Sequence, residues 1–143
     1  MSISTRLETA ATPMNRLVII VDDSETCAET LGIALESMQG TEVRILRSAR
    51  AARAALQGPL EIAALITDLD MPGSTGFELI DEIRAQPRFA HLPILMVSGN
   101  SHPHLADQAI ARGATAFFPK PYSPAMVRRK LDQLVCSTYK PKL

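Results

Sequence analysis

The sequence predicts an α/β fold in which a five-stranded parallel sheet is covered by five helices on both faces. Five short apolar runs recur at regular intervals along the chain, each of strand length. Between them lie segments whose apolar residues repeat with the period of a helix. The apolar runs are continuous and do not alternate with polar residues, which is typical of strands buried on both faces of a parallel sheet.

The predicted strands are residues 17–21, 43–46, 62–66, 94–97 and 114–118. Each run is short enough for a strand. Pro119 follows the last run and cannot donate a hydrogen bond to a neighbouring strand. In the flavodoxin-like strand order 2-1-3-4-5 this strand lies at the edge of the sheet, where a proline is tolerated.

The predicted helices are residues 25–38, 49–57, 76–85 and 105–111, and a last helix that begins at Pro124. Gly40 and Gly113 can end the first and the fourth. Ser123 can cap the last helix, and Pro124 suits its first turn. The residues expected on buried helix faces are Cys27, Leu31, Ala34, Leu35 and Met38 in the first helix, Phe77, Ile80 and Ile83 in the third, and Met126, Val127, Leu131, Leu134 and Val135 in the last.

The length of 143 residues fits one domain, which we place at residues 16–137. Residues 1–15 show no period and are expected to form a flexible leader, and residues 138–143 a short tail. No run approaches the roughly 18 apolar residues of a membrane span, and no secretory signal is visible, so we expect a cytoplasmic protein. Cys27 and Cys136 are interpreted as buried thiols in a reducing compartment.

The charge balance argues against nucleic acid or a membrane surface as a partner. Fifteen basic residues offset fifteen acidic ones, so there is no overall field that would draw the chain to a polyanion. His91, His102 and His104 are expected to be surface residues. Partners must therefore be recognised locally.

Candidate site residues follow four of the five predicted strands. They are Asp22 and Asp23 after the first, Asp68 and Asp70 after the third, Ser98 after the fourth and Lys120 after the fifth. Ligands of open α/β sheets bind beyond the carboxyl ends of the strands. If the first and third strands are neighbours, then Asp22, Asp23 and Asp68 converge there.

Three carboxylates in one pocket require neutralisation, and a hard divalent cation is the usual solution. Mg²⁺, or Mn²⁺, suits an all-oxygen set without His or Cys. A carboxylate, a cation and a lysine also suit phosphoryl transfer, with Asp68 as the nucleophile. Ser98 could then donate a hydrogen bond to one phosphoryl oxygen, and Lys120 could pair with another.

Four segments carry a resemblance to a known family. The sequences VDDSE, DLDMPGSTGFEL, SGN and KP, at the ends of four strands, resemble those of the receiver domain of two-component response regulators. The resemblance covers about residues 16–137, and the motifs occur in the family's order and spacing. It implies a CheY-like response regulator, and the short tail after the last helix leads us to expect a stand-alone one without an output domain.

The resemblance also implies a role for each site residue. Asp68 would be the phosphoacceptor. Asp23 and Asp68 would ligate Mg²⁺ directly, Asp22 through a water molecule, and Asp70 through its backbone carbonyl. Ser98 would match the family's hydroxyl residue and Lys120 its phosphate-binding lysine.

Two further residues match positions involved in switching. The Lys120–Pro121 bond would be cis, and Phe117 would match the family's rotameric aromatic, although it lacks the hydroxyl of the tyrosine often found there. Phosphorylation would then alter the face formed by the fourth helix, the fifth strand and the fifth helix.

The implied partners are proteins. The phosphoryl donor would be a histidine kinase or a histidine phosphotransfer protein, and the altered face would bind a downstream protein target or a second copy of the chain as a homodimer. The protein would be a switch and not an enzyme, apart from self-phosphorylation by small phosphodonors and autodephosphorylation.

Alternatives exist for the whole chain and for single residues. Asp68-Leu69-Asp70 superficially matches the DxD motif of haloacid-dehalogenase phosphatases, although that motif normally follows the first strand. A degenerate receiver would bind partners without phosphorylation. Taken singly, Asp22 and Asp23 could cap the first helix, Ser98 could cap the fourth, and Lys120 could be an exposed loop lysine.

Overall fold

A computed structural model describes residues 16–100 and 102–138, so the predicted leader and residues 139–143 of the tail lie outside it. Its main sheet contains β1 (Arg16–Val21), β2 (Thr41–Leu46), β3 (Ala64–Asp68), β6 (Ile94–Ser98) and β7 (Ala116–Pro119). All pairs are parallel and the order is β2-β1-β3-β6-β7. This is the predicted flavodoxin-like order, and Pro119 lies in an edge strand as expected.

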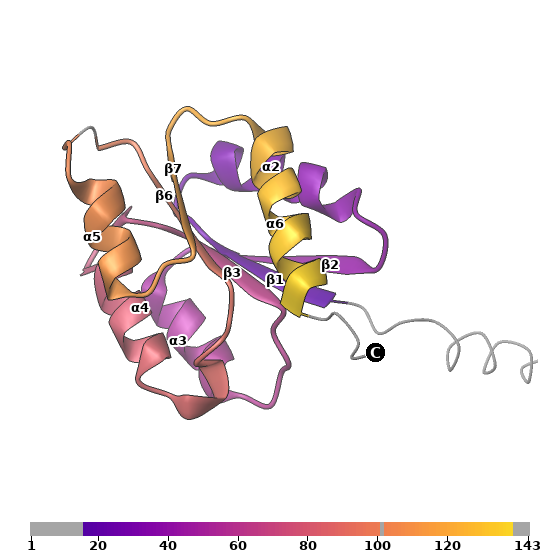
Figure 1. Cartoon of the computed structure of the whole chain (residues 1–143), viewed down its shortest axis with the longest axis horizontal. Helices are drawn as coiled ribbons and strands as arrows, with labels where there is room; N and C mark the ends of the chain where they lie inside the picture. Colours follow the sequence, from indigo (N-terminus) through magenta and orange to yellow (C-terminus); the bar gives the residue numbers. More distant parts are fainter. Residues whose placement is uncertain (1–15, 101, 139–143) are drawn as a thin grey trace, which may run out of the picture.

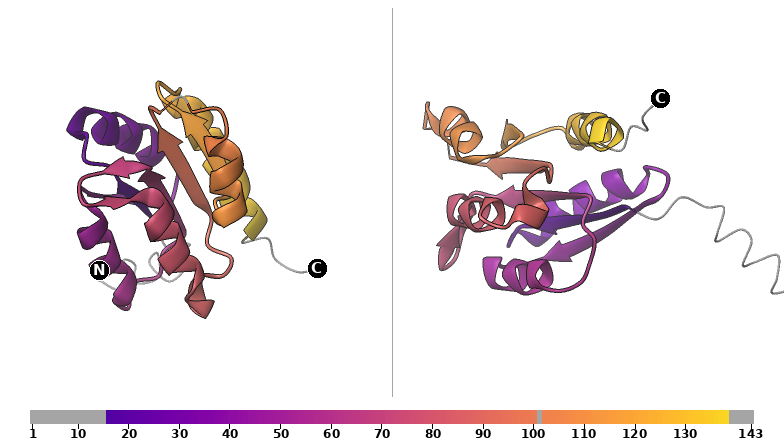
Figure 2. Two further views of the ribbon diagram at one scale, coloured as in Figure 1. Left: turned by 90° about the vertical axis from the view of Figure 1, so that its left-hand side faces the viewer. Right: turned by 60° about the horizontal axis from the view of Figure 1, so that its bottom comes forward.

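Five α-helices cover the sheet, three on one face and two on the other (Figures 1 and 2). They are α2 (Glu25–Glu36), α3 (Ala49–Gln57), α4 (Gly76–Arg84), α5 (Leu105–Arg112) and α6 (Pro124–Thr138). Buried residues of α3, α4 and α5 form one core, and those of α2 and α6 form the other. In Figure 1, α3, α4 and α5 lie on the lower left side of the sheet, and α2 and α6 lie on its upper right side.

The two cores explain why the strand sequences are continuously apolar. Along β1, Leu17, Ile19 and Val21 belong to one core, while Val18 and Ile20 belong to the other. Successive side chains point to opposite faces of a strand, so a strand that is covered on both faces needs apolar residues at every position.

The third strand lies two residues later than predicted. It pairs with β6 from Leu65 to Asp68, where Asp68 is opposite Val97. Ile62, at the start of the predicted run, precedes the strand. Hydrophobicity ends at Ile66, whereas the hydrogen-bonded ladder continues through two polar residues that are themselves buried.

One prediction of a buried helix residue was wrong, and another was met only in part. Met126 is 58% exposed, because α6 buries the stripe formed by Val127, Leu131 and Val135. Cys27 is half-buried, so the prediction of a buried thiol was met only in part. The side chain of Cys136 lies outside the described part of the chain.

Short elements between β3 and α4 were not predicted. Asp70–Met71 (β4) and Ser74–Thr75 (β5) form a small antiparallel hairpin whose turn contains Gly73, with φ +79°.

A 3-10 helix, η1 (Pro87–Phe89), lies between α4 and β6. Within the described residues, no helix is long and apolar enough to cross a membrane.

Candidate functional site

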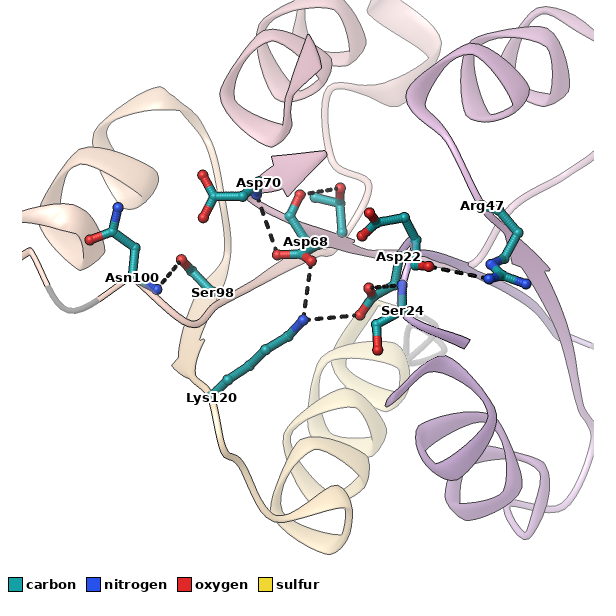
Figure 3. A network of polar contacts seen from close by, with 10 residues as sticks. Asp22, Ser24, Arg47, Asp68, Asp70, Ser98, Asn100 and Lys120 are labelled. Carbon is teal, nitrogen blue, oxygen red and sulfur yellow. Dashed lines mark hydrogen bonds and ion pairs between the residues drawn. The ribbon is translucent and has the colours of Figure 1, made fainter. Parts of the chain in front are cut away.

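The candidate site lies at the carboxyl edge of the main sheet (Figure 3). Asp22 directly follows β1, Asp68 ends β3, Ser98 ends β6 and Lys120 directly follows β7. The strands are parallel neighbours, so their carboxyl ends meet at this edge. Residues far apart in the sequence are thereby brought together, and Lys120 contacts Asp22 across a separation of 98 residues.

Three carboxylates converge in the site. Asp22, Asp23 and Asp68 each offer an oxygen, and these atoms lie within 4.8 Å of one another. Asp22 is 2% exposed and Asp68 6%, whereas Asp23 is exposed. A set of hard oxygen donors that is buried on one side and open on the other fits Mg²⁺, which binds carboxylates and keeps several water molecules.

Lys120 bridges two of the three carboxylates. Its Nζ donates to Asp68 Oδ2 at 3.1 Å and to Asp22 Oδ2 at 3.3 Å. Burial alone would lower the pKa of Lys120, but its hydrogen bond and ion pair with Asp68, together with the charge of Asp22, hold this pKa above its usual value. The lysine is therefore charged at neutral pH and offsets part of the negative charge.

The surroundings of Asp68 destabilise its ionised form. Burial raises its pKa, and the nearby charge of Asp22 acts in the same direction. Lys120 and the Asp70 N–H, which donates to Asp68 Oδ1 at 3.3 Å, oppose this shift without cancelling it. The ionised form of Asp68 is therefore less stable in this site than in water. This favours the binding of a further positive charge beside Asp68.

Backbone groups fix the orientation of the other residues. Asp22 Oδ1 accepts the Ser24 N–H at 2.9 Å. Ser24, not an aspartate, is the N-cap residue of α2, so the capping alternative for Asp22 and Asp23 is wrong. Asp22 is instead held with its second oxygen toward Lys120.

Ser98 is completely buried at the end of β6. Its Oγ accepts the Asn100 N–H at 3.0 Å, which leaves the hydroxyl proton of Ser98 available for donation. The N-cap residue of α5 is His104, so Ser98 does not cap that helix. The Ser98 carbonyl also accepts the Lys120 N–H at 2.7 Å and joins the two strand ends.

The remaining candidates lie around this centre. Asp70 is exposed at the start of β4, and the Lys120–Pro121 peptide bond is cis. Phe117 lies in β7 opposite Met96, half-buried against the core of α3, α4 and α5. His91, His102 and His104 are exposed, as expected.

Sequence reasoning missed two residues of this site. A Cβ on Gly76 would lie 2.5 Å from the Asp68 carbonyl oxygen and 2.9 Å from Met96 Cε, so this position needs glycine. Arg47 donates from Nη2 to the Asp23 carbonyl oxygen at 3.2 Å. The glycine could have been noticed as a residue unfavourable in a helix. The arginine could have been noticed because it directly follows the second predicted strand, the kind of position at which the other candidates were found.

Known proteins resemble this chain over most of its length. Residues 18–132 match the family model of the response regulator receiver domain. The transcriptional regulatory protein FixJ of Azorhizobium caulinodans is 35% identical over 115 residues, which are 80% of this chain and 53% of FixJ. The chain thus spans about half the length of that relative.

Two chemotaxis proteins match over nearly their whole length. CheY1 of Helicobacter pylori is 27% identical over 80% of this chain and 93% of its own. The structure of the chemotaxis response regulator CheY4 of Vibrio cholerae superposes with a TM-score of 0.75 at 30% identity, over 85% of this chain and 99% of that one.

Proposed function

The chain belongs to the response regulator receiver domain family, and we propose that it accepts a phosphoryl group on Asp68 in two-component phosphorelay signalling. Receiver domains are signalling proteins and not conventional enzymes. The observation that carries the proposal is the convergence of Asp22, Asp23 and Asp68 with Lys120 at one edge of the sheet. The residues are those that phosphoryl transfer to a carboxylate needs.

Asp68 is the proposed nucleophile. One carboxylate oxygen attacks the phosphorus atom, a bond forms between them, and the bond from phosphorus to the donor breaks. The leaving group departs with that electron pair and takes up a proton. The proposed donor is a phosphohistidine of a histidine kinase or a histidine phosphotransfer protein, in which the broken bond is P–N.

Receiver domains bind Mg²⁺ at an acidic pocket, and we assign that pocket to Asp22, Asp23, Asp68 and the backbone carbonyl of Asp70. An Mg²⁺ ion held by these groups would neutralise charge on the phosphoryl oxygens. The fit rests on donor chemistry, because the three side chains offer only hard oxygens and Asp23 is open to solvent.

Lys120 and Ser98 would receive the phosphoryl oxygens. Lys120 already contacts Asp68 Oδ2, so a small movement of its ammonium group would pair it with a phosphoryl oxygen on the same carboxylate. Ser98 can donate its unused hydroxyl proton to another. Both residues would stabilise negative charge that develops during transfer.

The proposed output surface is formed by α5, β7 and α6. It includes the half-buried Phe117, whose inward movement would follow the displacement of Ser98 toward the phosphate. Ile110 of α5 and Met126 of α6 are large apolar side chains that are 49% and 58% exposed. Apolar groups at a surface favour contact with a protein, here a downstream target or a second copy in a homodimer.

Intact-mass measurement after incubation with acetyl phosphate and Mg²⁺ tests the proposal. We expect one phosphoryl adduct on the wild-type chain and none on Asp68→Asn or in EDTA. Asp70→Asn changes an exposed carboxylate of the same motif and should still be phosphorylated. If rapid quenching captures no adduct and beryllofluoride does not bind, the chain acts without phosphorylation, and multiple turnover of phosphomonoesters would indicate a phosphatase instead.

A further inference from the structure

Arg47 lies beside the carboxylate cluster on the side away from Lys120. It follows β2 at one edge of the sheet, whereas Lys120 follows β7 at the other. The carboxylates come from β1 and β3 between them. Figure 3 shows the Arg47 guanidinium reaching toward the strand end that carries the aspartates, where its Nη2 donates to the Asp23 carbonyl oxygen at 3.2 Å.

The charge of Arg47 is not consumed by a direct ion pair. Among the residues that the structure describes, no carboxylate oxygen lies within 4.0 Å of its guanidinium, whereas Arg44 pairs with Glu42 at 3.9 Å and Arg112 with Asp81 at 2.8 Å. Its hydrogen bond goes to a neutral carbonyl. The positive charge of Arg47 is therefore not neutralised by an ion pair among the described residues, and it lies next to the backbone of Asp23, the exposed member of the cluster.

We infer that Arg47 sets the electrostatic balance of the site by disfavouring the metal cation and favouring the anionic phosphodonor. The first half of this inference rests on the proposed Mg²⁺ pocket, and the second half on the proposed phosphorylation of Asp68. A cation entering beside Asp23 approaches a like charge, and a phosphoryl group approaching the same opening meets an opposite one. One side chain therefore acts on the two ligands with opposite signs.

A purely structural role would have a different signature. If Arg47 only held the Asp23 carbonyl, its loss would loosen the loop and weaken binding of both ligands together. Arg47→Ala removes the charge and the hydrogen bond, Arg47→Gln removes the charge but keeps an N–H donor, and Arg47→Lys keeps the charge. These three variants separate the effect of the positive charge of Arg47 from the effect of its hydrogen bond to the Asp23 carbonyl.

Magnesium affinity is the first readout and does not require phosphorylation. In a titration followed by amide chemical shifts, we expect Arg47→Ala and Arg47→Gln both to bind Mg²⁺ about two- to fivefold more tightly than the wild type, and Arg47→Lys to match the wild type. The differences should shrink between about 0.1 M and 1 M salt, over which the Debye length falls from about 10 Å to about 3 Å.

Phosphodonor reactivity is the second readout, measured with Mg²⁺ saturating for each variant. Arg47→Ala and Arg47→Gln should be phosphorylated about two- to fivefold more slowly by acetyl phosphate. The loss should be smaller with phosphoramidate, which carries less negative charge. Arg44→Ala is the matched control, since Arg44 lies three residues earlier in β2, opposite Ile19, and should change neither quantity.

Weaker Mg²⁺ binding in Arg47→Ala that Arg47→Gln restores would overturn the inference in favour of a structural contact. Unchanged affinity and unchanged rates in both variants would also overturn it. If the wild-type chain takes up no phosphoryl group at all, the proposed function fails instead, and the magnesium arm still decides whether Arg47 opposes the cation.

Discussion

At the scale of single residues, the site carries more negative than positive charge. Asp22 and Asp68 share one lysine, and Asp23 adds a third carboxylate nearby. Burial makes this costly for Asp68, whose pKa is raised in spite of Lys120 and the Asp70 N–H. Asp68, whose ionised form is destabilised in this way, is well suited to bind a metal ion or to accept a phosphoryl group.

The raised pKa of Asp68 predicts the effect of Asp68→Asn on stability. A carboxyl whose pKa is raised by folding binds its proton more tightly in the folded chain, so its ionised form lowers stability at every pH above the folded pKa. Without metal at pH 7, we expect Asp68→Asn to raise the free energy of unfolding by about 1 kcal/mol, an ordinary size for one substitution.

The gain should disappear as the pH falls through the folded pKa toward the unfolded value of about 3.9, because Asp68 is then neutral in both states. Urea unfolding in EDTA at several pH values measures it. Asp70→Asn, at an exposed position, should show little change at any pH. A less stable Asp68→Asn at neutral pH would contradict the prediction.

At the scale of elements, the site depends on how closely α4 approaches the end of β3. The Gly76 N–H donates to the Leu69 carbonyl oxygen at 2.7 Å, which joins the helix start to the loop after the strand. Thr75 caps α4, because its hydroxyl oxygen accepts the Glu78 N–H and the Glu78 carboxylate accepts the Thr75 N–H. This capping box holds the helix end against the backbone of Asp68.

Gly76→Ala should therefore disturb both stability and the site. The added methyl would lie 2.5 Å from the Asp68 carbonyl oxygen and 3.1 Å from Leu69 Cα, which are backbone atoms that cannot rotate away. We expect a loss of about 1–3 kcal/mol in the free energy of unfolding, the usual cost of overpacking, with shifted amide resonances at Asp68 and Leu69.

Gly58→Ala is the matched control. Its Cβ would meet only the Ala55 carbonyl oxygen at 3.5 Å, an ordinary contact, and its φ of −82° suits any residue. Urea unfolding compares the two variants. Equal stability of Gly76→Ala and Gly58→Ala would show that α4 can move away from Asp68 without cost.

Elements were predictable from the sequence where hydrophobicity and hydrogen bonding coincide. The residues of α3 and the start of α2 are as predicted. Thr67 and Asp68 were placed outside β3, because a polar residue that is buried at a strand end leaves no hydrophobic signal. The β4–β5 hairpin has two residues in each strand, too few to show any period.

At the scale of the whole molecule, the site exists only when the complete sheet is formed. The four strand ends that meet there come from β1, β3, β6 and β7. Their residue types could be predicted as a set, because parallel strands end at one edge. The contact between Arg47 and Asp23 could not be predicted. The expected strand order already placed β2 beside β1, but it did not indicate that this side chain reaches across to the next loop.

This dependence couples metal binding to folding. A cation that binds the folded cluster but not the unfolded chain stabilises the folded state, by about 2.7 kcal/mol when its concentration is 100 times its Kd. We therefore expect Mg²⁺ to raise the free energy of unfolding of the wild-type chain at constant ionic strength. The gain should be much smaller in Asp23→Asn, which removes an exposed carboxylate of the cluster.

Glu36→Gln provides the control for nonspecific effects of charge. Glu36 is an exposed carboxylate at the last position of α2, and this helix starts at the site and runs away from it for 12 residues, a length of about 18 Å. Its Mg²⁺-dependent gain in chemical unfolding should equal that of the wild type. An equal gain in Asp23→Asn would mean that Mg²⁺ stabilises the chain elsewhere, since a site built from Asp22, Asp23 and Asp68 cannot lose one ligand without losing affinity.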